Sequence, residues 1–183
     1  DIVRPFNFPP DTPGRGWTIA EANHRSVAVV VAMGNVYVST LTSPFQDIMK
    51  GVDELHEQGV KTIIVDMHAE ATSEKLALAR YLDGKVSAVL GTHTHIPTAD
   101  AQILPEGTAY QTDVGMVGPV DSVIGMKVES SINRFLTQRR VKFQQSDDDH
   151  FLFQAVLVEI DNDGRAVEIE RIDKRMTIER TRV

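Results

Sequence analysis

The sequence contains no cysteine among its 183 residues. Disulfides, thiolate catalysis and cysteine-based zinc sites are therefore excluded, and any metal ion must be bound by His, Asp, Glu, Asn or water. Long apolar runs are lacking too, since none approaches the roughly 18 residues that a membrane-spanning helix needs. No signal peptide is visible, and we expect a cytoplasmic protein with no membrane partner.

The chain has fewer basic than acidic residues. The chain has 19 Lys and Arg against 26 Asp and Glu, which gives a formal net charge of -7. Because an acidic protein is repelled by polyphosphate, we expect no stable binding to nucleic acid. Hydrophobic residues make up 42% of the chain, enough for a packed core, and the length fits about one domain.

The first two thirds of the chain alternate between predicted strands and helices. The run Ser26–Ala32 is continuously apolar, as expected of a strand buried on both faces. Ser43 and Pro44 are a helix N-cap and first helical residue, and Gly59 ends that helix. The predicted elements are strands at 17–22, 26–32, 61–65 and 86–90, a turn at 23–25, and helices at 43–59 and 73–82. This order predicts a layered α/β core with a parallel sheet.

The end of the chain changes character. After a short strand at 108–113, a glycine-rich loop at 114–126 and a helix at 127–138, we predict antiparallel strands at 140–145, 151–160 and 166–172. Asp161–Gly164 is a turn between the last two strands. The predicted fold class is therefore α/β, with parallel core strands and an antiparallel C-terminal part.

Three histidines follow two predicted buried strands. His68 comes after the strand at 61–65, and His93 and His95 come directly after the strand at 86–90. Side chains of an extended segment alternate in direction, so His93 and His95 point the same way. If the two strands are neighbours, three imidazoles meet at the carboxyl edge of the sheet, where α/β proteins bind ligands. Taken singly, each histidine could instead be a polar residue at a strand end, but together they predict a metal site.

Several polar residues lie near these histidines in the sequence. Asp66 is a candidate for orienting a ligating histidine, because a carboxylate can bind its second ring nitrogen. Lys75 is expected to form a salt bridge on a helix surface, and Glu74 to be a helix first-turn charge. We expect the nearby threonines to cap local turns. The remaining residues of this neighbourhood are Glu70, Asp100 and Asp113, and the threonines are Thr92, Thr94 and Thr98.

Four stretches resemble the YmdB family of calcineurin-like metallophosphoesterases. They are "VRPFNFP" (3–9), "DMHAEATSEK" (66–75), "GTHTHIPTAD" (91–100) and "ILPEGTAYQTDVGMVGP" (103–119). The resemblance runs in order along almost the whole chain. It implies a layered α/β/β/α sandwich and hydrolysis of a small-molecule phosphodiester, with 2′,3′-cyclic nucleotides as a candidate substrate class.

The resemblance also implies a dinuclear metal site. Its two ions would be divalent or trivalent, with iron or manganese as the expected occupants. Residue by residue, the match makes His68 and His93 resemble ligands of one metal, and His95 a ligand of the other. Residues 91–95 resemble the family's G-x-H-x-H block.

The sequence departs from the family at its start. Members begin with G-D-V, Glu-Asn and G-N-H blocks that supply a bridging carboxylate, an Asn ligand and the histidine thought to act as general acid. Residues 1–183 resemble the C-terminal two thirds of one such domain, so the general acid is expected in the preceding segment. Without a bridging anion, we expect one weakly bound metal and little hydrolysis. A missing strand layer would leave an apolar sheet face exposed, so we also expect self-association into a homo-oligomer or coverage by a partner.

Two other functions stay open at this point. The chain could be a non-catalytic metal- or nucleotide-binding regulatory module, which a reading frame lacking the three upstream blocks would favour. It could also be a zinc amidase that uses the same three histidines and a base, although no H-E-x-x-H helix is present.

Overall fold

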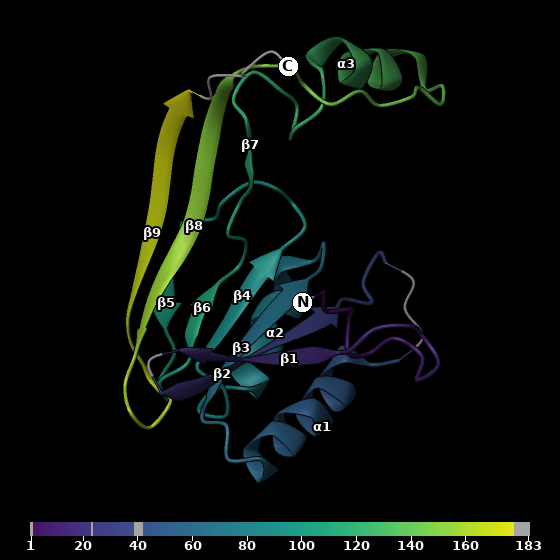
Figure 1. The fold of residues 1–183 in the computed structure, drawn as a ribbon. Coiled ribbons are helices and arrows are strands. Elements are labelled where there is room, and N and C mark those ends of the chain that lie inside the picture. The colour runs from purple at the N-terminus through teal and green to yellow at the C-terminus, as the bar shows by residue number, and fades with distance from the viewer. Residues whose placement is uncertain (1, 23, 39–41, 178–183) are drawn as a thin grey trace.

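The computed structural model describes residues 2–22, 24–38 and 42–177, which form two sheets and three helices (Figure 1). The helices are α1 (Pro44–Glu57), α2 (Thr72–Tyr81) and α3 (Val128–Thr137). The strands are β1 (Trp17–Ala22), β2 (Arg25–Met33), β3 (Thr62–His68), β4 (Ala88–Thr92), β5 (Gln102–Ile103), β6 (Ala109–Gln111), β7 (Val117–Pro119), β8 (His150–Ile160) and β9 (Ala166–Thr177).

The larger sheet has six strands in the order β1-β2-β3-β4-β6-β5. Its four central strands, β2, β3, β4 and β6, pair in parallel, and the two edge strands pair antiparallel. The smaller sheet, β7-β8-β9, is antiparallel throughout. The predicted fold class is therefore confirmed, with parallel core strands and an antiparallel C-terminal part.

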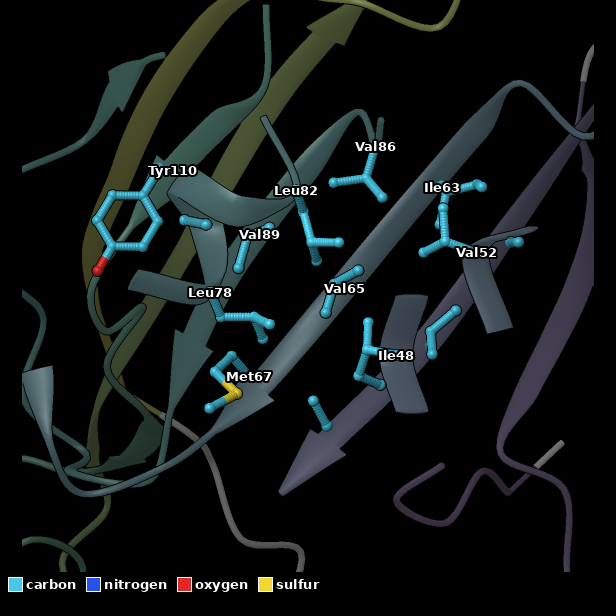
Figure 2. Close-up of a cluster of buried hydrophobic side chains, with 14 of the residues drawn as sticks. Ile48, Val52, Ile63, Val65, Met67, Leu78, Leu82, Val86, Val89 and Tyr110 are labelled. Atoms are coloured by element: carbon cyan, nitrogen blue, oxygen red, sulfur yellow. The ribbon is translucent and has the colours of Figure 1, made fainter. Parts of the chain in front are cut away.

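Helices α1 and α2 cover one face of the larger sheet and bury its main core (Figure 2). Pro44 begins α1, because its fixed φ suits the first helical position, where no backbone donor is needed. Gly59, with a φ of 80°, follows the end of this helix. The fully buried side chains between the helices and the sheet include Ile48, Val52, Leu55, Ile63, Val65, Met67, Leu78 and Leu82.

The opposite face of the larger sheet is covered only in part. A small cluster joins Ala88 and Ala109 to Ala166 of β9, so the base of the β8–β9 ribbon packs on one side of this face. Along β2, Val27, Val29 and Val31 point to the same side but are only half-buried. This apolar surface is the one expected to favour self-association, which stays a prediction.

Some sequence predictions need correction. Residues 140–145 form no strand, apart from an isolated bridge of Gln145 to Met126, and β8 pairs instead with β7 at its start and with β9 along its length. The glycine-rich loop contains β7, and β5 was not anticipated. Strand β9 runs five residues beyond its predicted end at 172, to Thr177. The predicted turn at 23–25 includes Asn23, which lies outside the described residues. Among the helices described, none is long and apolar enough to cross a membrane.

Gly91 is the tightest point of the β4 backbone. A Cβ atom there would lie 1.7 Å from the Thr112 carbonyl oxygen and 2.9 Å from Cδ of Lys75. Backbone atoms cannot move aside cheaply, so we expect Gly91→Ala to lower the free energy of unfolding by more than about 3 kcal/mol, as overpacking and strain add. Urea unfolding measures this change.

Gly118→Ala is the matched control. A Cβ at Gly118 in β7 would meet only the flexible Met116 side chain, at 3.2 Å or more. We expect a change of less than about 1 kcal/mol, since alanine also restricts the unfolded chain. Equal losses for the two variants would contradict the close approach at Gly91.

Candidate functional site

His68 and His93 meet where β3 and β4 end. The parallel register pairs His68 with Thr92, so the residue that follows Thr92 lies beside the His68 ring. The two rings are nearly perpendicular, with centroids 4.8 Å apart, and Nε2 of His68 lies 3.1 Å from Nδ1 of His93. The expected neighbouring strands are confirmed, and they bring two of the three predicted histidines into direct contact.

The proton positions on His68 follow from its hydrogen bonds. Thr92 Oγ1 donates to Oδ1 of Asp66 at 2.7 Å, and it also lies 3.1 Å from Nδ1 of His68. A hydroxyl has only one proton, so Nδ1–H of His68 must donate to Thr92. In the neutral ring, Nε2 of His68 then keeps its lone pair and directs it toward His93.

The same reasoning applies to His93. Its Nε2 lies 3.1 Å from Oε2 of Glu70, an acceptor, so the proton of the neutral ring belongs on Nε2. The lone pair then lies on Nδ1, which faces Nε2 of His68. Two lone pairs facing each other across this distance repel unless a proton or a cation lies between them.

The facing nitrogens of His68 and His93 suit a shared metal ion. Two nitrogens that each lie about 2.1 Å from one ion are about 3.0–3.4 Å apart for angles between 90° and tetrahedral. Ligating histidines also donate their second N–H to a neighbouring acceptor, as both rings do here. Burial, followed by the nearness of His93, lowers the pKa of His68 and so favours its neutral, ligating form.

His95 lines the same cavity but does not touch the other two rings. Its Nδ1 donates to the Ile124 carbonyl oxygen at 3.0 Å, which leaves the lone pair of the neutral ring on Nε2. Within the described residues, no group of three or more His, Asp or Glu side chains is placed to hold one ion. The ligand roles of the three histidines stay predictions.

A cavity of about 690 Å³ opens beside the histidines. The glycine-rich loop forms one wall, where Gly115 lets the backbone pass close to Gln154. Much of the remaining lining is apolar, from Met116, Val117, Pro119, Ile124, Met126 and Phe151. The cavity therefore offers nitrogen ligands on one side and an apolar surface for an organic group on the other.

Two of the candidate carboxylates support the histidines. Asp66 reaches His68 through Thr92, and Glu70 contacts His93 directly. Burial raises the pKa of Asp66, and the hydrogen bond from Thr92 works in the opposite direction. Both carboxylates therefore act on the ring nitrogens that face away from the contact between His68 and His93, one through Thr92 and one directly.

The other candidates hold the polypeptide in place. Glu74 is buried and accepts hydrogen bonds from the backbone N–H groups of Asn35 and Val36, so it is more than a first-turn charge. Asp100 binds Thr112. Lys75 is fully buried and paired with Asp113 at 2.9 Å, so the prediction of a surface salt bridge was wrong.

Thr92 is the functional residue that the sequence reasoning missed. Thr94 makes a local bond to the Ile96 carbonyl group, as expected, whereas Thr98 bonds the backbone of Asp113, 15 residues away. Thr92 links the side chains of Asp66 and His68. The sequence position of Thr92 could have revealed this role, because Thr92 directly precedes His93. Successive residues of a strand point to opposite faces, so Thr92 faces away from the helices while Gly91 faces toward them.

The chain matches a family model and several known proteins. A family model described as "YmdB-like protein" matches residues 1–172. The chain is 47% identical over 174 residues to the 2′,3′-cyclic-nucleotide 2′-phosphodiesterase of Bacillus subtilis (strain 168). It resembles the crystal structures of a hypothetical protein from Thermus thermophilus, with TM-score 0.87 and 44% identity, and of a novel phosphatase from Mycoplasma pneumoniae, with TM-score 0.84 and 35% identity.

The matches cover most of this chain but only part of each relative. The Bacillus match covers 94% of this chain and 65% of the relative. The Thermus match covers 94% of this chain and 67% of that one, and the Mycoplasma match covers 96% and 64%. The chain thus spans about two thirds of the length of the proteins it resembles.

Removing the Thr92 hydroxyl should weaken metal binding. Thr92→Val leaves Nδ1 of His68 without its acceptor, so neither the ring orientation nor the ligating tautomer is held. We expect the half-saturating manganese concentration, measured by electron paramagnetic resonance, to rise by about 10- to 100-fold. Thr92→Ser keeps the hydroxyl and should bind as the parent does. Equal binding by the valine and serine variants would contradict the role of this hydroxyl.

Acid should destabilise the protein partly through Asp113. Burial alone would raise the pKa of this carboxyl, but hydrogen bonds from Lys75, Thr94 and Gly115 outweigh it and hold the pKa below its ordinary value. The ionised form therefore favours the folded state above the unfolded-state pKa, and this stabilisation is lost as the pH falls through that value and then the folded one.

Asp113→Asn should remove this pH dependence. We expect it to cost about 3 kcal/mol at pH 7, because Lys75 is left buried and unpaired, and to cost less as the pH approaches 3. Urea unfolding between pH 7 and pH 3 measures both changes. Asp53→Asn, at an exposed position of α1, is the control and should follow the parent curve. A constant difference between Asp113→Asn and the parent at all pH values would contradict the expectation.

Proposed function

Because the chain belongs to the family of YmdB-like proteins, we propose that it forms the larger part of a metal-dependent phosphodiesterase. The proposed substrates are small phosphodiesters such as 2′,3′-cyclic nucleotides, the class named for the Bacillus relative. The observation that supports this proposal most is the approach of Nε2 of His68 to Nδ1 of His93. These two nitrogens lie 3.1 Å apart beside an open cavity, with the lone pairs of the neutral rings facing each other.

In this proposal, His68 and His93 hold one ion and His95 holds a second, with iron or manganese as the occupants. Bound ions of this kind lower the pKa of water and neutralise phosphate oxygens. The protein's own part is to orient the ligands: Glu70 holds the His93 ring, and Thr92 holds the His68 ring. The apolar wall of the cavity would receive the organic part of the substrate.

Charge balance leads us to assign residues 1–183 to the C-terminal two thirds of one metallophosphoesterase domain. Two metal ions about 3.5–4 Å apart repel each other and need an anionic ligand between them. The three histidines are neutral ligands and carry no such charge. We propose that a preceding segment provides the bridging carboxylate and the general acid, and that the protein acts in the cytoplasm. The 183 residues alone would then bind one metal weakly and hydrolyse little.

A second candidate function is a regulatory module that binds a metal or a nucleotide without catalysis. The observation in its favour is that the described residues join only two histidines and place no carboxylate between them. The two functions differ in turnover. A catalytic site consumes a phosphodiester, whereas a module of this kind only binds it.

His93→Ala tests the proposal in the complete natural protein that carries these residues. With manganese present, we expect hydrolysis of an aryl phosphodiester and of 2′,3′-cyclic AMP, and the variant should lower kcat/KM by more than about 100-fold, which exceeds the effect of losing a partner of a ligand. Release of the aryl alcohol, followed by absorbance, measures this.

His56→Ala is the control for this experiment, since His56 lies in α1, its ring bonds the Lys85 carbonyl oxygen, and it is not among the described residues that line the histidine cavity. It should leave kcat/KM unchanged. Turnover that survives His93→Ala would refute the site. Binding of the cyclic nucleotide without any turnover, with manganese or iron supplied, would favour the regulatory module.

A further inference from the structure

A buried ion pair lies directly behind the histidine segment. Lys75 of α2 and Asp113, two residues after β6, are both fully inaccessible to solvent, and Nζ lies 2.9 Å from Oδ2. Burying two charges is costly, and apolar residues of similar size often replace such pairs without loss of stability. Stability of the fold is therefore a weak explanation for this pair, and its other contacts matter more.

The Asp113 carboxylate holds two walls of the cavity. Oδ2 also accepts the backbone N–H of Thr94 at 2.9 Å, and Oδ1 accepts that of Gly115 at 3.0 Å. Thr94 lies between His93 and His95, whereas Gly115 belongs to the glycine-rich loop. One buried side chain thus connects the histidine segment to the start of the glycine-rich loop, and both segments line the cavity.

The backbone of the histidine segment needs such support. His93 has a φ of 110° and His95 a φ of 65°, both in the left-handed region that residues with a side chain rarely adopt. Such conformations persist only where the surroundings fix them. The hydrogen bond from Thr94 to Asp113 lies between the two strained residues, and it fixes the peptide that determines where both rings point.

Lys75 in turn fixes Asp113. With its side chain fully buried, Lys75 is the cation beside this carboxylate, so it keeps Asp113 in its acceptor-only form, which can receive both N–H groups. The lysine stem also packs against Gly91, where an added Cβ would lie 2.9 Å from Cδ. Helix α2 is thereby linked to the segment that follows β4.

We propose that Lys75 and Asp113 are positioning residues of the histidine site. Asp113 fixes the turn that directs His93 and His95 into the cavity, and Lys75 holds Asp113 in place and ionised. Neither residue lines the cavity or touches the reacting atoms. This inference rests on the proposed function, because it assumes that the histidines bind metal.

Manganese affinity of the complete natural protein that carries these residues separates positioning from mere stability. We expect Lys75→Met and Asp113→Asn each to raise the half-saturating manganese concentration by about 10- to 100-fold, the range seen when partners of ligands are lost. Leu78→Ala is the control, because Leu78 is fully buried one turn further along α2 and is not among the residues that line the cavity. All variants are measured by electron paramagnetic resonance at a temperature where circular dichroism shows that they are folded.

The outcomes distinguish a failure of the positioning role of Lys75 and Asp113 from a failure of the metal site itself. Manganese affinity that falls equally in Leu78→Ala, or that stays unchanged in Lys75→Met, would overturn the positioning role. His93→Ala serves as the reference: if it too leaves manganese affinity unchanged, then the metal site itself fails. Loss in His93→Ala without loss in Lys75→Met refutes only the positioning pair.

A milder variant covers the case in which Lys75→Met does not fold. Lys75→Gln keeps a hydrogen-bond donor but removes the charge. Nitrogen-15 spectra of the histidine side chains then report the tautomers directly. We expect the ring signals of His93 and His95 to shift or broaden in this variant while those of His56 stay in place. Unchanged signals for all three histidines would overturn the proposal.

Discussion

The parallel register of β3 and β4 is the constraint on which the site depends. It pairs Met67 with Gly91 and His68 with Thr92, so the side chains that face away from the helices form one row at the carboxyl edge of the sheet. A shift of one residue would turn His68 toward the helical core and separate it from His93. The register is itself fixed by burial, because Val65 and Met67 must face the helices.

A second consequence concerns charge. Each carboxylate near the histidines is already engaged, since Asp66 and Glu70 orient rings, Glu74 and Asp113 hold backbone N–H groups, and Asp100 binds Thr112. None of them can move between two metal ions without breaking such a contact. In the part of the chain that the structure describes, the site therefore has oriented neutral ligands but no bridging anion, which agrees with the proposal that this anion comes from a preceding segment.

The sequence could predict features that arise from local pattern. Apolar runs such as 26–32 identified the core strands, although one face of this strand is only half-buried, and the order of elements identified the parallel sheet. The sequence could not predict whether 140–145 would pair, because an alternating pattern forms a strand only where the fold places a partner strand beside it. Lys75 was misplaced for a similar reason: a lysine at a helical position is usually exposed, and only the tertiary fold reveals the buried partner that lies 38 residues away.

The histidines illustrate the same limit and show what the fold adds to the motif. The H-x-H spacing suggested that His93 and His95 would point the same way, as they do in an extended strand. Their positive φ values show instead that the segment leaves the strand, so the two rings have different partners. His93 meets His68, whereas His95 donates to Ile124. Each of the three rings nevertheless has one nitrogen facing an acceptor, so its neutral form has the other nitrogen available to a cation. The fold thus selects the ligating tautomer of each ring by ordinary hydrogen bonds, and these bonds do not require the metal to be present.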